Sequence, residues 1–421
     1  MENSSPDLGR APPLPPTTFL LLAAPLLAAC TIVHGDDPSA VRSHIDEPPD
    51  TEYIDAVEWA RPLVRAFMVE ENLPGLSLAV GMAGKVVWAE GFGWADIGAR
   101  RPVTPKTRFR IGSVAMPMTA TAVGLLHERG LLDLDAPVRD YVPSFPEKEW
   151  PVTTRQLMGH VAGVRRYGDD EEELYMRGHC ETALDGLKLF ADDPLLFEPG
   201  TRYLYSNYGW TLVGAVVEAA AGEPFLNFLQ REIFDPVRMQ DTILDDPTGL
   251  VAPRTSLYFP AAVRDPSLGV HDANDADNTC LQGAGGLLST PTDVVRFGLA
   301  MLDGHLLRSE TLAALQTPLE PGSGESTGHG LGWFVREISI AEASEPTTVI
   351  GYEGSSAGGT TSFATLPEHR IVIATTTNVS FARSLAADDE LGGGVRPFFR
   401  ALSLPRVLAN TFARANAAAQ R

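Results

Sequence analysis

Segments with strand character lie near both ends of this chain, and the long stretch between them is mostly helical. Near the amino end, two largely apolar runs at residues 76–82 and 86–92 are joined by the short turn Ala83-Gly84-Lys85, as in a β-hairpin. Turn residues also separate four late segments that we expect to be strands, at residues 331–337, 347–351, 361–366 and 370–376.

This distribution predicts an α+β fold. A sheet buries its apolar face against other elements, so strands from the two ends of a chain are expected to share one sheet. We predict an antiparallel sheet flanked by helices, built from residues 53–112 and 330–382. A mostly helical region of about 113–315 is inserted between its two halves.

Helical periodicity and end signals define the remaining elements. Apolar residues at helical spacing predict a first helix over residues 53–71, which the segment Asn72-Leu73-Pro74-Gly75 ends. Further helices are expected at residues 120–128, 153–160, 182–190, 208–221 and about 406–418. We therefore assign residues 53–421 to one folded domain.

The amino-terminal residues resemble an export signal. The apolar run at residues 19–30 is shorter than the ~20 residues that a membrane span requires, and its end, Leu27-Ala28-Ala29-Cys30, is similar to the cleavage box of bacterial lipoproteins. We expect residues 1–30 to be a signal peptide, a lipidated Cys30 to attach the protein to a membrane surface, and the location to be secreted or cell-envelope. An ordinary signal or a single anchor is the alternative. Residues 31–52, rich in Asp, Pro, Ser and Glu, are expected to be a flexible tether.

The net charge and the spacing of the histidines argue against nucleic-acid binding and against a metal site. A net charge of −21 argues against nucleic acid as a partner, because such partners need basic patches. The nine histidines show no metal-binding spacing, and the acidic run at residues 169–173 reads as a solvated loop, so neither a metal nor a cofactor is expected. Cys180 and Cys280 would close a loop of about 100 residues if they paired. We favour two unpaired thiols.

The strongest candidate for chemistry is Ser113, which follows a short strand-like run and opens a helix. Residue 116 lies one turn further on the same face, because positions i and i+3 are neighbours on a helix. This is the geometry of a Ser-x-x-Lys nucleophile site, with Met116 in the place of the lysine. The N–H of Ser113, at a helix start, would supply half of an oxyanion hole.

Two other segments carry polar groups suited to the same site. Tyr205 and Asn207 lie two residues apart in a loop before a helix, where a phenol moves protons and an amide orients a substrate. By itself this triplet suits a helix cap better. The second segment contains Tyr352 and Gly354, just before a strand, and its small residues let a substrate lie against the strand edge. By itself it suits a glycine-rich turn better.

Taken together, the three segments resemble the serine β-lactamase and penicillin-binding protein superfamily. The flanking residues are most similar to class C β-lactamase-related serine hydrolases, in particular to the mitochondrial-type β-lactamase-like peptidases. These flanks are residues 131–138, 142–148, 159–167, 282–289 and 330–333. The resemblance implies hydrolysis of a small-molecule or peptide substrate through an acyl-enzyme.

The resemblance also implies roles for individual residues. Ser113 would be the nucleophile, Tyr205 the proton carrier and Asn207 the substrate-orienting amide. The backbone N–H groups of Ser113 and Ser355, the latter beside Gly354, would form the oxyanion hole.

The chain departs from this pattern at two positions where the family carries a cation. Met116 replaces the motif lysine, and Tyr352, followed by Glu353, replaces the lysine or histidine of the third motif. A thioether neither accepts the serine proton nor stabilises a phenolate. We therefore predict impaired hydrolysis, with His160, His329 or Lys106 as substitute bases. The alternative is an inactive relative that binds a ligand or protein partner in the same groove.

Overall fold

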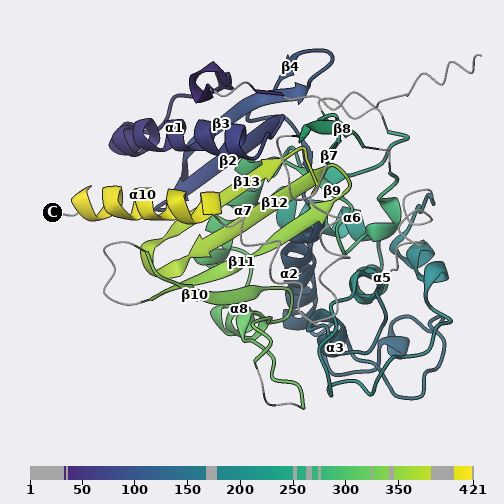
Figure 1. Cartoon of the computed structure of the whole chain (residues 1–421). Helices are drawn as coiled ribbons and strands as arrows, with labels where there is room; N and C mark the ends of the chain where they lie inside the picture. Colours follow the sequence, from purple (N-terminus) through teal and green to yellow (C-terminus); the bar gives the residue numbers. More distant parts are fainter. Residues whose placement is uncertain are drawn as a thin grey trace, which may run out of the picture.

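The structure is a computed structural model of the chain. It describes the residues 33–34, 37–166, 178–249, 254–261, 268–273, 276–322, 324, 326–340, 346–380 and 403–419. At its centre lies an eight-stranded sheet with the strand order β1-β3-β2-β13-β12-β11-β10, in which β4 also pairs with β3 (Figure 1).

The two ends of the chain meet in the middle of this sheet. The strand β2 pairs antiparallel with β13, from Leu76 opposite Thr377 to Met82 opposite Ile371. All neighbouring pairs of the large sheet are antiparallel, so the prediction of one antiparallel sheet from both ends of the chain is confirmed. Its strands are β1 (Ser43–His44), β2 (Gly75–Met82), β3 (Lys85–Asp96), β4 (Arg101–Pro102), β10 (Phe334–Ile338), β11 (Thr347–Ser356), β12 (Gly359–Leu366) and β13 (Ile371–Thr377).

Strand β10 begins three residues later than the sequence pattern predicts. The N–H of Gly330 donates to the carbonyl of Trp333 at 2.8 Å, and Gly332 has a φ of +90°. This turn holds the first residues of the apolar run out of the sheet, because a strand requires a negative φ.

The two faces of the sheet carry different helices (Figure 1). On one face, α1 (Ile54–Glu70) and α10 (Ser403–Ala419) lie side by side. They share a core with Leu78 and Val80 of β2. On the other face, α7 (Pro291–Leu302) packs close to the backbone at Gly81, where an added Cβ would lie 2.7 Å from Val295. The domain therefore consists of a sheet with a helical layer on each side.

Helix α2 (Ala115–Glu128) is the centre of the second layer, and nearly all of its residues are buried. It packs against α5 (Asn207–Ala221), α6 (Phe225–Leu229) and α8 (Ser309–Gln316). Because every face of this helix meets other elements, the residues that precede it, including Ser113, are held in place.

The inserted region is less uniformly helical than predicted. Two small sheets are formed by this region and the strand that precedes it. One sheet consists of β5 (Phe109–Arg110), β9 (Leu287–Ser289) and β6 (Ile243–Leu244), and the other of β7 (Tyr258–Pro260) and β8 (Val270–Asp272). Among the described residues, this region also contains α3 (Thr154–Met158), the 3₁₀ segments η3 (Gly112–Val114), η4 (Val138–Asp140), η5 (Ala183–Leu189) and η8 (Thr279–Leu281), and the π-helical η6 (Gln230–Phe234). Three further 3₁₀ segments lie outside it: η1 (Pro38–Ala40), η2 (Thr51–Tyr53) and η9 (Pro367–His369).

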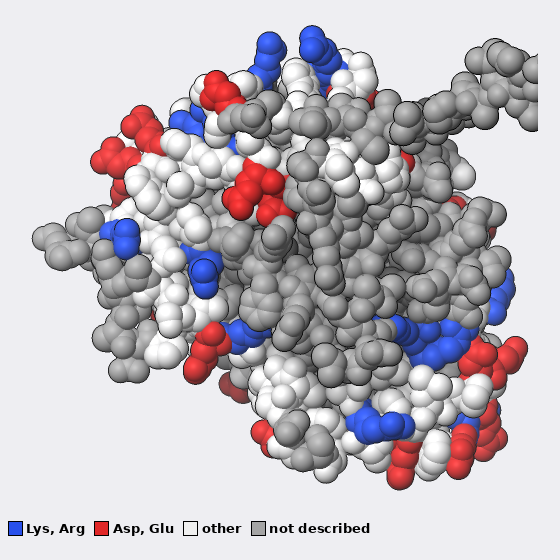
Figure 2. Space-filling view, viewed as in Figure 1, with Lys and Arg blue, Asp and Glu red and all other residues white. Residues whose placement is uncertain are grey.

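No single helix among the described residues is long and apolar enough to cross a membrane. The segments Asn207–Ala221 and Phe225–Phe234 meet that criterion only as a pair, and the pair is bent by 75°. On the face seen in Figure 2, acidic and basic side chains are interspersed over the described surface.

The flexible tether expected at residues 31–52 is wrong for the described part of this segment, residues 33–34 and 37–52, where even the N–H of Val33 donates to the Asn72 side chain at 3.0 Å. Ser43 of β1 pairs with Phe92 of β3, and Val41 is buried in the core formed with α1. The open edge of β3 offers backbone hydrogen bonds to a passing segment whatever its composition, which a tether prediction based on composition overlooks. Residues 1–30, with Cys30, lie outside the described residues.

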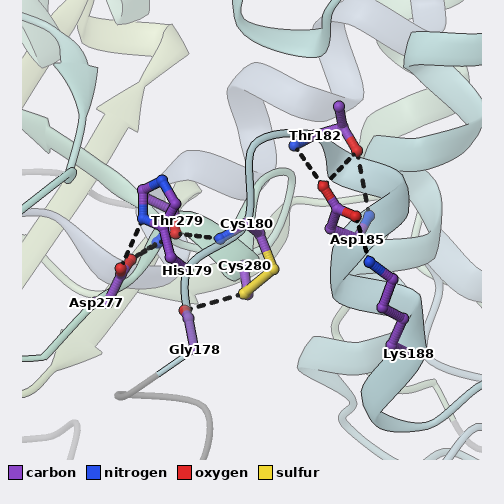
Figure 3. The surroundings of a disulfide bond; sticks show 9 residues. All are labelled: Gly178, His179, Cys180, Thr182, Asp185, Lys188, Asp277, Thr279 and Cys280. Carbon is purple, nitrogen blue, oxygen red and sulfur yellow. Dashed lines mark hydrogen bonds and ion pairs between the residues drawn. A yellow bond between two sulfur atoms is a disulfide. The ribbon is translucent and has the colours of Figure 1, made fainter. Parts of the chain in front are cut away.

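Cys180 and Cys280 form a disulfide, so the prediction of two unpaired thiols is wrong (Figure 3). Their Cα atoms are 4.9 Å apart, and the N–H of Cys180 donates to the Thr279 hydroxyl at 2.9 Å. The bond joins the residues before η5 to η8, across 100 residues of sequence. Nothing in the local sequence around either cysteine indicates this approach.

A buried ion pair positions the strand that leads to Ser113. The guanidinium of Arg110 in β5 is 2.6 Å from the carboxylate of Asp245, and both side chains are 1% exposed. It also donates to the carbonyls of Ala276 at 2.6 Å and Ala357 at 3.0 Å. Arg110 thus joins β5 to the loop between β11 and β12.

We expect Arg110→Met to lower the free energy of unfolding by about 2–4 kcal/mol, because it removes the more buried of the two ion-pair partners of Asp245 and the donor to two carbonyls, while Arg254 still lies 3.2 Å from the same carboxylate. Urea unfolding measures this. The control is Arg155→Met, which removes an exposed pair with Asp135 and should cost about 1 kcal/mol or less. Equal losses in the two variants would contradict the structural role of Arg110.

Candidate active site

Ser113 lies at the point where a short strand turns into the central helix. It is the middle residue of η3, which follows β5 and leads directly into α2, and 8% of the residue is exposed. The turn depends on Gly112, which has a φ of +51° and packs against the backbone of Ser355. The structure therefore places Ser113 at a helix start, as the sequence predicts.

The second segment reaches Ser113 from the start of α5. The side chain of Ser206 caps this helix by accepting from the N–H of Gly209, and Asn207 is its first residue. This cap directs Tyr205 towards α2, where its hydroxyl is 2.7 Å from the Ser113 Oγ. Tyr205 also hydrogen-bonds to Asn207. The contact between Tyr205 and Ser113 brings together two of the segments predicted to share a site.

The third segment supplies the edge of the large sheet. Strand β10 pairs with β11 only as far as Gly351, and the following residues of β11 lie against η3. A Cβ at Gly354 would lie 1.9 Å from the Ile111 carbonyl and 3.0 Å from the Ser113 nitrogen. A glycine is thus required here, and it brings the backbones of Ser113 and Ser355 together.

Tyr352 and Met116 occupy the two positions where a cation is expected. Met116 is fully buried, and its sulfur accepts from the Tyr205 hydroxyl at 3.7 Å. Tyr352 is 2% exposed, hydrogen-bonds to Tyr205, and stacks at 4.6 Å between ring centroids on Phe334 of β10. The site around Tyr205 is therefore built of hydroxyl, amide and thioether groups.

The Tyr205 hydroxyl has a single proton and several partners. It lies 2.7 Å from the Ser113 Oγ, where either oxygen can donate, and 3.7 Å from the Met116 sulfur, which can only accept. Burial raises the pKa of Tyr205, although its hydrogen bonds to Ser113, Tyr352 and Asn207 oppose the effect. Tyr205 is consequently a neutral phenol beside a thioether, which accepts no proton.

His160 is close to this network but does not contact Ser113. Its Nδ1 accepts from the backbone N–H of Ser206 at 3.1 Å, and its Nε2 lies 3.3 Å from both the Tyr352 hydroxyl and the indole N–H of Trp210, which can only donate. Its ring stacks on that of Tyr205 at 4.4 Å. Burial holds the pKa of His160 well below its ordinary value, so the ring is neutral.

The other two candidate bases are also poorly suited. Burial lowers the pKa of His329 to about 4, and its Nε2 is 3.2 Å from the Tyr203 hydroxyl. Lys106 is exposed in the loop before β5. None of the hydrogen-bond partners of Ser113 and Tyr205 among the described residues is a cation.

Comparison with known proteins identifies the family of this chain. The sequence model of one protein family, described as Beta-lactamase, matches residues 60–393. The chain belongs to the Beta-lactamase family. The human protein "Serine beta-lactamase-like protein LACTB, mitochondrial" is 29% identical over 400 residues, which cover 74% of this chain and 72% of that protein. Penicillin-binding protein 4* of Bacillus subtilis is 25% identical and is matched over 68% of this chain and 64% of its own.

Solved structures show the same fold. The octameric penicillin-binding protein homologue from Pyrococcus abyssi superposes with a TM-score of 0.66 at 24% identity, over 77% of this chain and 74% of that chain. The D-amino acid amidase from Ochrobactrum anthropi gives a TM-score of 0.67 at 22% identity, over 86% and 99%. The chain is thus a β-lactamase-related serine hydrolase family member with a β-lactamase and penicillin-binding protein-like fold.

Within this Beta-lactamase family domain, sequence reasoning missed the aromatic groups that enclose Tyr352. Tyr203 and Phe334 both pack against His329, with ring centroids at 5.0 and 3.8 Å. Tyr203 is two residues before Tyr205 in the same loop, and this spacing was the one available signal. Phe334 comes from the strand after the turn at Gly332, and only the pairing of β10 with β11 brings it here.

Proposed function

We propose that this protein is a serine hydrolase in which Ser113 attacks the carbonyl of an ester, amide or peptide, at a rate limited by the absence of a cation beside Tyr205. The observation that carries the proposal is the 2.7 Å contact between the Ser113 Oγ and the Tyr205 hydroxyl, which has the Met116 sulfur 3.7 Å away where a cation is expected.

Each step of the reaction has a group that performs it. Ser113 forms a bond to the carbonyl carbon and passes its proton to Tyr205 while Tyr205 passes its own proton to the leaving-group atom of the substrate, and the N–H groups of Ser113 and Ser355 stabilise the oxyanion. Asn207 orients the substrate. Expulsion of the leaving group gives an acyl-enzyme, which water hydrolyses to regenerate Ser113.

The proton transfer is the slow step in this proposal. Tyr205 accepts the Ser113 proton only if it has already lost its own proton or loses it in the same step. The Met116 thioether accepts no proton from it. A positioned general base contributes about 10²–10⁴ in rate. We therefore expect a hydrolysis rate well below that of an efficient hydrolase. A ligand-binding role without turnover is the second candidate, which the complete burial of Met116 and Tyr352 favours.

A fluorophosphonate probe tests the proposal directly. We expect slow labelling of the purified protein at Ser113 and none in Ser113→Ala. The matched control, Ser356→Ala, changes a neighbouring half-buried serine and should label like the wild type. A folded wild-type protein that stays unlabelled over days would contradict the hydrolase and leave the binding role.

We also propose that the mature protein is exported and held at a membrane surface through Cys30. The disulfide between Cys180 and Cys280 supports export, because disulfides persist in oxidising compartments.

A further inference from the structure

His160 lies buried near the Ser113 site, in a backbone conformation that is unfavourable for any residue with a side chain. Its φ is +59°, and only 3% of the residue is exposed. It is the second residue after helix α3, where glycine is usual because it adopts the left-handed conformation without strain. The strain at His160 is therefore compensated by contacts that its side chain makes in the folded domain.

Both chain neighbours of Tyr205 are hydrogen-bonded to His160. The His160 carbonyl accepts from the N–H of Leu204 at 2.8 Å, and its Nδ1 accepts from the N–H of Ser206 at 3.1 Å. Residues 202–206 have no regular secondary structure, so the loop does not hold Tyr205 in place by a ladder of its own. These two hydrogen bonds fix the backbone on each side of Tyr205 and thus the point from which its side chain departs.

The imidazole ring of His160 also restrains the side chain of Tyr205. The two rings are stacked, with centroids 4.4 Å apart and an interplanar angle of 26°. The His160 Nε2 lies 3.3 Å from the Tyr352 hydroxyl, which in turn hydrogen-bonds to Tyr205. A hydroxyl donates or accepts, so this contact suits either tautomer of the ring. His160 therefore restrains Tyr205 through the loop backbone, through ring stacking and through Tyr352.

Other buried groups hold the His160 ring itself. The indole N–H of Trp210 on α5 lies 3.3 Å from its Nε2, and the rings of Tyr203 and His329 meet it edge-on with centroids 5.8 Å away in both cases. Burial holds the pKa of His160 well below its ordinary value, and the nearby His329 adds to this effect. The ring is therefore uncharged at neutral pH, and it does not replace the missing cation beside Tyr205.

We propose that His160 is the positioning residue of the Ser113 site, which holds the Tyr205 hydroxyl at hydrogen-bond distance from the nucleophile. The contact that it maintains is the 2.7 Å separation between the Ser113 Oγ and the Tyr205 hydroxyl. A misplacement of about 1 Å in such a contact costs about 10²-fold in rate. The role requires no contact between His160 and the substrate, and it rests on the proposed reaction of Ser113.

Saturation kinetics of fluorophosphonate labelling separate this role from an effect on binding. We expect His160→Ala to lower the maximal labelling rate at Ser113 by about 10–10²-fold, because Tyr205 is displaced in the reaction step. The probe concentration that gives half of this rate should stay unchanged. His160→Asn suits the left-handed backbone and keeps an acceptor for the N–H of Ser206, so it should recover part of the loss.

A double-mutant cycle tests whether His160 acts through Tyr205. In a Tyr205→Phe protein, which lacks the hydroxyl, His160→Ala should cause no further loss of labelling rate. A role of His160 in the general stability of the fold would lower the rate in both backgrounds. The matched control is His127→Asn, which removes an exposed imidazole that contacts the Leu132 carbonyl and should label like the wild type.

The possible outcomes distinguish His160 from the hydrolase itself. Circular dichroism and urea unfolding verify that each variant is folded, and His160→Asn replaces His160→Ala in every comparison if the alanine variant does not fold. Equal maximal rates in the wild type and the folded His160 variants, or the same loss with and without the Tyr205 hydroxyl, would overturn the positioning role alone. A folded wild type that never labels would contradict the hydrolase and, with it, the reaction that His160 serves.

Discussion

Replacing Met116 by lysine is expected to raise the rate of Ser113 labelling and of ester hydrolysis by about 10²–10⁴. Methionine and lysine have unbranched side chains of similar length, so the new amine would stand near the position of the sulfur, 3.7 Å from the Tyr205 hydroxyl. A neutral amine there accepts the proton that Tyr205 must pass on when it takes the proton of Ser113. A charged amine stabilises the Tyr205 phenolate.

Burial favours the reactive form of this lysine. Met116 is 0% exposed, and desolvation lowers the pKa of a buried lysine because it penalises the ammonium. The same desolvation makes the variant less stable than the wild type, so its fold is checked by circular dichroism before rates are compared. The measurement is the initial rate of a chromogenic ester together with fluorophosphonate labelling.

Two further variants test whether the gain depends on the lysine amine and on the Tyr205 hydroxyl. Met116→Leu keeps the size and apolar character and should leave the slow wild-type rate unchanged. Met116→Lys combined with Tyr205→Phe should lose the gain, because the phenol that relays the proton is absent. A folded Met116→Lys protein with the wild-type rate would show that the missing cation is not what limits Ser113.

Removing the disulfide is expected to lower the free energy of unfolding by about 4–5 kcal/mol. The bond closes a loop of 100 residues, and in the chain-entropy model the cost of its loss grows with the length of that loop. Cys180 and Cys280 are 6% and 3% exposed, so Cys180→Ala with Cys280→Ala replaces them with small apolar residues suited to a buried position. Urea unfolding at neutral pH measures the loss.

The reductant provides the internal control for this experiment. Dithiothreitol should shift the unfolding midpoint of the wild type towards that of the double alanine variant, and it should leave the double variant unchanged. Equal midpoints for the oxidised wild type and the double variant would mean that the bond does not stabilise the domain. Because the loop contains Tyr205 and Asn207, we also expect the double variant to label more slowly at Ser113.

The sequence predicted the elements that repeat a local pattern. The hairpin of β2 and β3 and the approximate extents of α1, α5, β12 and β13 follow from apolar periodicity and from turn residues such as Gly84 and Gly222. Ser113, Tyr205 and Asn207 were selected from short motifs and from the resemblance to the β-lactamase-related family, and they lie at the starts of helical segments or directly before them.

Local sequence patterns did not predict the contacts that determine the chemistry. The approach of Cys180 to Cys280, the docking of Ser43 on β3 and the stacking of Phe334 on Tyr352 join residues that are distant in sequence. A local pattern carries no information on such pairs, since it reports which residues share a face and not what that face meets.

The sequence by itself determined the family, indicated Ser113 as the candidate nucleophile, and showed Met116 and Tyr352 where two cations are expected. Only the tertiary structure decided what surrounds Tyr205 in place of those cations: the Met116 thioether, and the ring of His160, whose two nitrogens face the N–H groups of Ser206 and Trp210. It also revealed that Glu353, which reads as part of a turn, is a buried carboxylate without a partner among the described residues. The physical reason is that the pKa and reactivity of a group depend on burial and on its partners, and both are set by packing between distant segments.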